Sequence, residues 1–398
     1  MSSPRSTAAR RRVAPPPLAA SVVLRHSRAP RTAGIPVAAR DGPDTSRATI
    51  PSRNGADQER CRSGTVPSRN DDMTTTMRAW RSLAPGLDGL ALDTIAPPEP
   101  GPHELLVRVE AAALNFADLL MADDRYQVRP QRPFTMGQEL AGTVVAAGSG
   151  ATFAPGLRVA GKVETGAFAD YAVLRQDLAM AVPDGLSAAT AAALPIVYTT
   201  ALVALTESTV VTPGERVLVT AAAGGVGLAA VEIAHHLGAF VIAAAGGADK
   251  CALARSHGAD AAIDYRSDNL GEAVARLTEG RGVDVIVDAV GGEAKDLLRL
   301  LAWGGRWLIT GFAGGAIPQI PANRLLLRRL SAIGVYFHPD HDGAMLARVG
   351  DRLSRLAAAG AVSPHVGATH AFEALPDALV ALRDRATTGK VILRVADA

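Results

Sequence analysis

The chain has 398 residues, of which 48% are hydrophobic and 20% charged, and its formal net charge is +2. This length suffices for two domains with cores of their own, and the near-neutral charge gives no reason to expect nucleic-acid binding. Two cysteines, Cys61 and Cys251, are too few for a disulfide framework, and no apolar run reaches the roughly 18 residues of a membrane span, so we expect a cytoplasmic protein that does not enter membranes.

Residues 1–76 differ in composition from the rest of the chain. They are rich in Arg, Pro, Ser, Thr and Ala, and the first forty contain eight arginines and no acidic residue. Few large apolar side chains are present to bury, so a disordered extension is predicted. The composition is similar to that of an organelle transit peptide, but Pro15, Pro16 and Pro17 would interrupt its helix. We favour a mis-assigned start codon, with translation beginning at Met73 or Met77.

From Met77 to about residue 193 the pattern is one of short strands separated by Pro and Gly clusters. Such spacing predicts a compact, barrel-like β domain. A helix is expected over 375–384, and a final strand over 391–395 is expected to return to this first domain. We therefore assign 77–193 and 331–398 to one domain. Its other strands are predicted at 77–80, 104–114, 141–148, 158–163 and 168–174.

The segment 216–238 has the pattern of a dinucleotide-binding turn. A short apolar strand at 217–219 precedes a G-x-G-x-x-G-like sequence in which Ala222 takes the first glycine position, and apolar residues at helical spacing follow it. Glycines without Cβ atoms let a pyrophosphate approach the backbone, and the start of a helix presents free N–H groups to it. The predicted phosphate loop consists of Gly224, Gly225, Val226 and Gly227.

The region 194–330 alternates strands with helix-like segments, which specifies an α/β fold with a doubly wound parallel sheet. Further strands are predicted at 239–245, 260–265, 283–290 and 305–312. A cofactor should lie across their carboxyl ends, near Gly246, Ala289–Gly291, Gly311 and Phe312.

The end of the second strand indicates which dinucleotide is bound. An NAD enzyme needs an acidic residue there for the ribose 2′-hydroxyl, and this chain has Gly246 and Gly247 instead. Lys250 follows, within reach of a 2′-phosphate, although it can equally be a solvated lysine in the first turn of a helix. Asp249 is interpreted as the N-cap of a helix over 251–258. NADPH is therefore favoured over NADH.

Several motifs together resemble those of a known family. They are ALNFADLL (113–120), GQELAGTVVAAG (137–148), AAAGGVG (221–227), VDVIVDAVGG (283–292) and the closing ATTGKVILRV (386–395). From Met77 onward the chain resembles the zinc-independent, zeta-crystallin-like quinone oxidoreductases of the medium-chain dehydrogenase/reductase superfamily. That resemblance implies a GroES-like catalytic domain built from both ends of the chain, a Rossmann domain inserted at 194–330, an active site between them, and a homodimer, for which residues 333–337 are a candidate edge strand.

The resemblance also implies roles for individual residues. Asn115 and Thr199 align with positions beside the nicotinamide, Tyr126 with a tyrosine near the acceptor, and Lys250 and Tyr265 with positions around the adenosine phosphate. The simpler interpretation of Tyr126 and Tyr265 is a half-buried amphipathic ring. Two further residues receive no catalytic role. Asp118 could orient a neighbouring residue, but we expect it to cap the helix of the ADLLM segment (117–121), and Lys390 is expected to be a surface lysine.

No metal is expected at the predicted site. Where zinc-bearing relatives have a cysteine and a Gly-His-Glu motif, this chain has Asn115 and Gly137-Gln138-Glu139, and amides are poor zinc ligands. The close pair His338 and His341 is separated by Pro339, which makes a shared helical face improbable.

Hydride transfer without a metal needs an acceptor that is already electrophilic. We therefore predict an NADPH:quinone oxidoreductase in which Asn115 and Tyr126 hold the acceptor oxygen and water or Tyr126 supplies the proton. An enone, enal or enoyl thioester reductase is the alternative, and Arg125 and Arg129 make an anionic acyl thioester conceivable. An alternative of another class is an NADPH-binding protein with little turnover.

Overall fold

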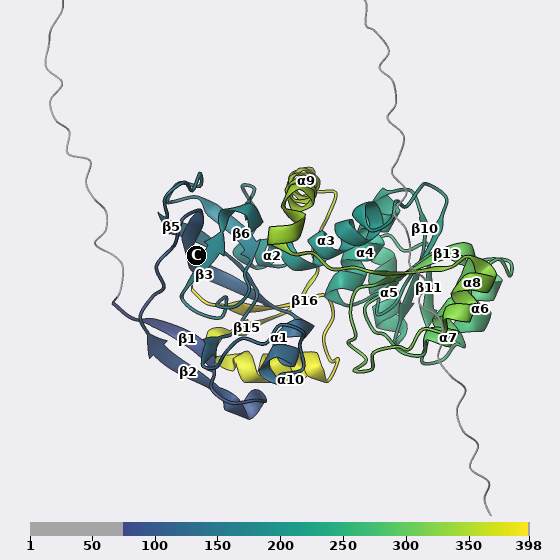
Figure 1. Cartoon of the computed structure of the whole chain (residues 1–398), viewed down its shortest axis with the longest axis horizontal. Coiled ribbons are helices and arrows are strands. Elements are labelled where there is room, and N and C mark those ends of the chain that lie inside the picture. The colour runs from purple at the N-terminus through teal and green to yellow at the C-terminus, as the bar shows by residue number, and fades with distance from the viewer. Residues whose placement is uncertain (1–74, 397–398) are drawn as a thin grey trace, which may run out of the picture. The chain divides into compact units, whose positions relative to one another are not determined.

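The computed structural model describes residues 75–396 (Figure 1). Most of the predicted disordered extension, 1–76, therefore lies outside the described residues. Within 75–396, the helices are all too short or too polar to cross a membrane.

The first part of the fold is a β domain of GroES type. A seven-stranded sheet has the order β15-β16-β3-β5-β6-β8, with β7 also paired to β3, and a small sheet has the order β2-β1-β4. The strands are β1 (Met77–Ser82), β2 (Leu90–Ile95), β3 (Glu104–Leu114), β4 (Phe134–Thr135), β5 (Glu139–Ala147), β6 (Arg158–Lys162), β7 (Tyr171–Arg175), β8 (Ala179–Ala181), β15 (Val366–Ala371) and β16 (Lys390–Arg394). Strand β16 pairs antiparallel with β3, with Val391 opposite Leu114, which confirms that the last strand returns to the first domain. Helices α1 (Phe116–Ala122) and α10 (Leu375–Arg383) contact each other.

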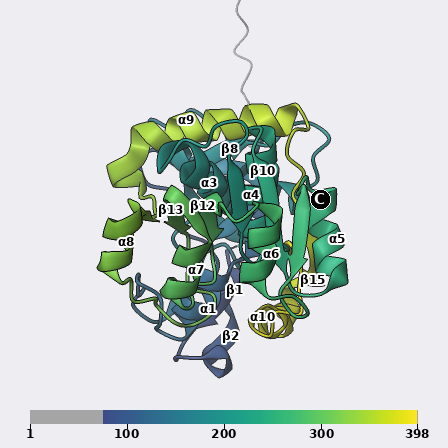
Figure 2. The same cartoon turned by 90° about the vertical axis from the view of Figure 1, so that its right-hand side faces the viewer.

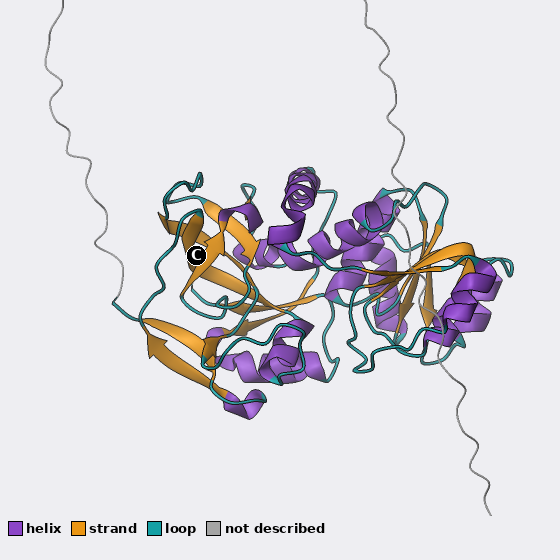
Figure 3. Ribbon diagram, viewed as in Figure 1, coloured by secondary structure: helices purple, strands orange, loops and turns teal. Residues whose placement is uncertain are grey.

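The second part is a six-stranded sheet in which every pairing is parallel (Figure 3). Its order is β11-β10-β9-β12-β13-β14, the Rossmann order 3-2-1-4-5-6. The strands are β9 (Arg216–Val219), β10 (Phe240–Ala245), β11 (Ala261–Asp264), β12 (Val283–Asp288), β13 (Leu301–Ile309) and β14 (Ser331–Gly334). Because β14 begins at Ser331, this sheet continues past residue 330, where we placed the domain boundary.

Helices cover both faces of the parallel sheet because successive side chains point to opposite faces. Val217 and Val219 share a core with α3 and α4, whereas Leu218, between them, packs with α6 and α7. The helices are α2 (Ala188–Ala192), α3 (Pro195–Leu202), α4 (Gly225–His236), α5 (Ala248–Ser256), α6 (Leu270–Leu277), α7 (Ala294–Leu300), α8 (Ala322–Arg328) and α9 (Pro339–Ala358).

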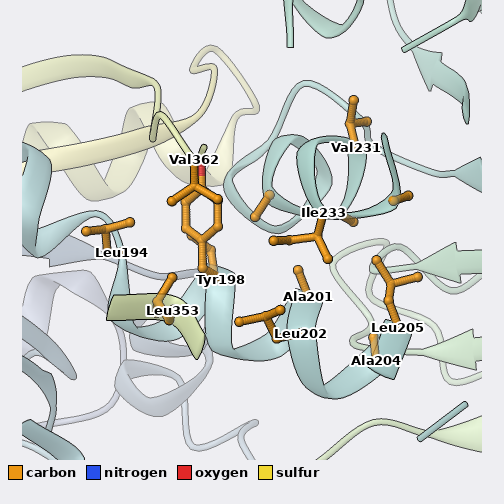
Figure 4. Close-up of a cluster of buried hydrophobic side chains, with 14 of the residues drawn as sticks. Leu194, Tyr198, Ala201, Leu202, Ala204, Leu205, Val231, Ile233, Leu353 and Val362 are labelled. Atoms are coloured by element: carbon orange, nitrogen blue, oxygen red, sulfur yellow. The ribbon is translucent and has the colours of Figure 1, made fainter. Parts of the chain in front are cut away.

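One core connects the two sheets. It contains Ala113, Ala141 and Ile392 of the seven-stranded sheet together with Val217 of the parallel sheet. Figure 4 shows side chains of α3, α4 and α9 gathered in this core, among them the fully buried Leu202. Helices α2 and α3 thus join the β domain to the parallel sheet through continuous apolar packing.

Three details differ from the sequence-based expectation. Helix α4 begins at Gly225 rather than after Gly227. Helix α5 begins at Ala248 with Gly247 as its N-cap, so the prediction that Asp249 is the N-cap was wrong; Asp249 lies in the first turn. The twenty-residue helix α9, prominent in Figure 2, was not anticipated. Pro339, which we took as a helix breaker, occupies its first turn, where no intrahelical N–H bond is required.

Candidate functional site

The glycine loop between β9 and α4 is shaped by two different requirements. A Cβ atom added at Gly224 would press on the Ala221 carbonyl oxygen at 3.3 Å and meet no other atom within 4 Å, so the space beside Gly224 is open on its remaining sides. At Gly227 the added atom would lie 2.3 Å from the same oxygen. Gly227 is therefore needed for the packing of α4 on the turn, whereas Gly224 leaves room for a ligand at the start of a twelve-residue helix.

A pocket of about 450 Å³ opens at the end of β10. It is lined by Gly246, Gly247, Ala248, Asp249, Lys250, Leu253, Arg266 and Thr388. Lys250 donates from Nζ to the Arg385 carbonyl oxygen at 3.0 Å, which holds its ammonium toward the C-terminal segment. The Tyr265 hydroxyl lies 2.8 Å from a Cβ atom built at Gly246, so a side chain there would collide with the ring. The structure thus places Tyr265 against Gly246, and Gly246 and Lys250 in the lining of one pocket.

Arg266 and Thr388 line this pocket and were missed by sequence reasoning. Arg266 adds a second cation to Lys250, so two basic residues face one acidic residue, Asp249. The signal for Arg266 was its place directly after the strand that ends with Asp264, at the same edge of the sheet. Thr388 comes from a segment more than a hundred residues away, and no local pattern predicts its position.

A polar cluster lies where β3, β5 and β16 meet. Lys390 donates from Nζ to Asn115 Oδ1 at 2.7 Å, to Glu139 Oε2 at 2.7 Å and to the Leu114 carbonyl at 2.9 Å. Asn115 Nδ2 donates to Glu139 Oε2 at 3.1 Å, and Glu139 Oε1 accepts from the Ile196 N–H of α3 at 2.6 Å. The amide of Asn115 is therefore held in one orientation by a buried ion pair.

The expectation that Lys390 is a surface lysine was wrong. Lys390 is only 3% exposed and Glu139 is fully buried. The Cδ atom of Lys390 lies 2.9 Å from the position of a Cβ atom built at Gly225, so the ion pair lies directly against the glycine loop. The available signal was alternation along the strand, because Lys390 is on the same face as the buried Ile392.

Asp118 caps α1, as expected. Its Oδ2 accepts the Asn115 N–H at 2.7 Å in a capping box, and the side chain is almost completely buried. Burial raises the pKa of Asp118 to about 7, although the Asn115 N–H and Lys390 oppose the shift. Its other oxygen, Oδ1, is buried without a hydrogen-bond partner among the described residues.

Tyr126 and Thr199 belong to the segments that follow two members of this cluster, Asn115 and Glu139, in the chain. Tyr126 follows α1 and is half-buried against the β-domain core. Burial raises the pKa of Tyr126, with smaller contributions from Tyr336 and Asp118, so its hydroxyl stays protonated and can donate. Thr199 lies on α3 one turn beyond Ile196, whose N–H holds Glu139.

Gly311 and Phe312 lie in the loop after β13, at the carboxyl edge of the parallel sheet. This loop is bonded to the loop after β12, because the Ala313 N–H donates to the Ala289 carbonyl at 3.0 Å. Arg385 donates to the Ala313 carbonyl at 3.3 Å, which links the loop to the segment before β16. The predicted cofactor-binding loops thus adjoin one another at the ends of the strands.

Within residues 75–396, histidine, cysteine and acidic side chains form no group of three or more that could hold a metal ion. Asn115 Oδ1 and Glu139 Oε2 already share the ammonium of Lys390. His338 and His341 have ring centroids 5.3 Å apart at the start of α9.

Comparison with known proteins matches both parts of the fold. Residues 101–184 match the alcohol dehydrogenase GroES-like domain, and residues 225–349 match the zinc-binding dehydrogenase family. The chain is 39% identical over 309 residues to quinone oxidoreductase-like protein 2 of Rattus norvegicus. This match covers 76% of this chain and 88% of the rat protein. It is 35% identical over 227 residues to a mycocerosic acid synthase-like polyketide synthase of Mycolicibacterium smegmatis, covering 56% of this chain and 11% of the synthase. A mycobacterial protein solved in complex with NADPH superimposes with a TM-score of 0.75 at 31% identity, covering 80% of this chain and all of that one.

A GroES-like domain joined to a Rossmann sheet by a shared core, with a glycine loop against a polar cluster, defines a medium-chain dehydrogenase/reductase that binds a nicotinamide cofactor and acts on small molecules. Within that superfamily, the chain belongs to the zinc-independent quinone oxidoreductase family.

Proposed function

We propose that this oxidoreductase uses NADPH to reduce quinones. The observation that carries the proposal is the contact between the two halves of the site: the buried Lys390–Glu139 pair orients Asn115 and at the same time lies against Gly225 of the phosphate loop. A nicotinamide cofactor bound along the glycine loop supplies a hydride from C4 of its ring. The residues of the chain position the cofactor and the acceptor and handle the proton.

Asn115 is better placed to bind the cofactor than the acceptor oxygen. Both N–H groups of its amide are engaged, by Glu139 and by the Ala113 carbonyl at 3.2 Å. Its Oδ1 accepts one bond from Lys390 and has a second lone pair. We propose that this lone pair accepts a bond from the nicotinamide carboxamide, with Thr199 as a further polar contact, and that the acceptor oxygen is held by the protonated hydroxyl of Tyr126.

Preference for NADPH rests on the pocket at Gly246, where Lys250 and Arg266 provide the positive charge that a 2′-phosphate requires. Replacing both residues with methionine should raise the Kd for NADPH by about 100-fold or more, because each lost charge-assisted hydrogen bond is worth about 1.5–3 kcal/mol. The Kd for NADH should change little. Cofactor fluorescence titration measures both constants, and equal losses for the two cofactors would contradict the assignment.

The acceptor is tested by steady-state oxidation of NADPH with a panel of quinones, enones and enoyl thioesters. We expect the largest kcat/KM with a quinone. The thioester alternative is supported by the match to a polyketide synthase and by the exposed Arg125 and Arg129 beside Tyr126. Binding of NADPH without acceptor-dependent oxidation would instead favour a nucleotide-binding protein with little turnover.

We also propose a homodimer. Strand β14 has β13 as its sole partner strand among the described residues, which leaves a free edge at the end of the parallel sheet. The preceding helix α8 exposes Leu326 and Leu327, at 78% and 69%. The division into domains 77–193 plus 331–398 and 194–330, and a cytoplasmic location, remain predictions.

A further inference from the structure

Four neighbouring strands place a polar residue on the same face and near the same end. On β16, β3, β5 and β6 the face that packs on α2 and α3 is apolar at Ile392, Ala113, Ala141 and Ala160. Two residues along, on that same face, stand Lys390, Glu139 and Lys162 within their strands and Asn115 as the extended residue directly after β3. The first three form the polar cluster described above. Lys162 is the fourth, and neither the sequence motifs nor the proposed function assign it a role.

Lys162 lies directly opposite Glu139 in the antiparallel pairing of β5 and β6. Side chains of directly opposed residues project from the same face of a sheet, with Cβ atoms about 4.5–5.5 Å apart. Helix α3, which contains Thr199, contacts β6. Lys162 therefore belongs to the same side of the sheet as Asn115.

The Glu139 carboxylate, which lies between the two lysines, accepts three hydrogen bonds, and none of them comes from Lys162. Glu139 Oε2 accepts from Lys390 and Asn115, and Oε1 accepts from the Ile196 N–H. Lys162, in contrast, has neither a hydrogen bond nor an ion pair among residues 75–396, and its ammonium lies 5.8 Å from the centre of the Phe337 ring. A half-buried cation without an acceptor is costly unless water or a ligand satisfies it.

The charges around Lys162 are few. Glu139 of β5 and Glu164, which follows β6, are the ionised groups that act on it. Helices α2 and α3 and strand β8 pack against β6 without contributing a charged side chain. Burial lowers the pKa of Lys162, opposed by the two glutamates, which makes its proton easier to release.

We propose that Lys162 is a catalytic residue that binds the acceptor oxygen as it becomes anionic and then gives it a proton. This inference rests on the proposed function. The acceptor takes two electrons with the hydride from NADPH, which becomes NADP⁺. The N–H bond of the Lys162 ammonium breaks as the oxygen of the hydroquinone monoanion, or of the enolate, gains its proton. The neutral amine recovers a proton from water.

Turnover provides one test. Lys162→Met keeps the aliphatic length and removes the charge, and it should lower kcat/KM for the acceptor by about 100-fold, the scale of lost general-acid catalysis, with the Kd for NADPH unchanged. Lys295→Met, at a lysine that is 54% exposed, is the matched control and should behave as wild type. In the pH profile of kcat/KM, the alkaline limb of the wild type should begin at a pH lower than the ordinary pKa of lysine. Lys162→Arg should move this alkaline limb to higher pH, because the guanidinium keeps its proton. A merely structural lysine would not shift the limb.

A spectroscopic test does not depend on turnover. 4-Nitrophenol bound in the presence of NADP⁺ mimics the anionic product, and its absorption distinguishes phenol from phenolate. We expect the wild type and Lys162→Arg to bind the phenolate below the free pKa of 4-nitrophenol, and Lys162→Met to lose the phenolate band. The two tests can give different results. If no acceptor is reduced but the phenolate band is lost in Lys162→Met, Lys162 binds an oxyanion and the proposed reductase function is wrong. If Lys162→Met matches the wild type in band and pH profile, the assignment of Lys162 is overturned.

Discussion

At the residue scale, the Lys390–Glu139 pair controls both stability and site geometry. Its two charges are almost completely buried, so removal of one leaves the other unpaired in a medium that solvates it poorly. We expect Lys390→Met to reduce the free energy of unfolding by about 3–5 kcal/mol. The double variant Lys390→Met with Glu139→Gln should recover part of this loss, because glutamine retains an acceptor for the Ile196 N–H. Urea unfolding measures both, and a loss below about 1 kcal/mol in the single variant, the range of exposed ion pairs, would show that the pair is solvated.

Asp118 gives a pH dependence of defined sign. Its pKa in the folded protein is raised to about 7, so the folded state binds a proton that the unfolded chain has already released between about pH 4 and 7. The stabilisation that this residue contributes is fully present below about pH 4, decreases as the pH rises from about 4 to 7, and is absent above that range. Asp118→Asn keeps an acceptor for the Asn115 N–H and removes the titration. The melting temperature of the variant relative to wild type should therefore rise across this window and level off above it. A constant difference in Tm would contradict the raised pKa.

At the scale of elements, the glycine loop separates ligand binding from packing. Gly224→Ala adds a methyl group that presses on one atom, the Ala221 carbonyl oxygen at 3.3 Å, and the φ of −86° is one that alanine adopts freely, so we expect a smaller loss of stability than at Gly227. The same methyl group should obstruct the pyrophosphate and weaken NADPH binding by about 10-fold or more. Gly227→Ala is the matched comparison: its Cβ would overlap the Ala221 carbonyl, and we expect a clear loss of Tm. Melting curves and NADPH titrations of both variants check the distinction.

The elements themselves were largely predictable. Strands β9 and β10 and helix α4 follow from an apolar run, a glycine turn and helical spacing, all of which are local properties of the sequence. Helix α9 was missed because Pro339 suggests a break when its position relative to the helix start is unknown. The N-cap of α5 was misassigned because Asp249 has the right side chain, whereas the backbone of Gly247, with φ at +102°, makes the turn.

At the scale of the whole molecule, the free edge of β14 and the exposed leucines of α8 predict association of two copies. Leu326→Glu with Leu327→Glu places two charges on this surface and should shift the mass measured by light scattering from twice the chain mass of 41.0 kDa to once. NADPH affinity should be retained, because α8 does not line the pocket at Gly246. A wild-type chain that is already monomeric would refute the dimer.

The sequence by itself determined the α/β class, the glycine turn between β9 and α4 and the family, because period, turn chemistry and motif spacing are encoded over short stretches of chain. It did not determine the surroundings of Asn115. Residues 115, 139 and 390 are brought together only by the pairing of β3 with β5 and β16, and Arg266 and Thr388 meet only at the pocket beyond β10. The tertiary structure decided that Lys390 is buried and paired while Lys162, opposite the same glutamate, has no acceptor within residues 75–396, because the charge balance of a site depends on which strands are neighbours.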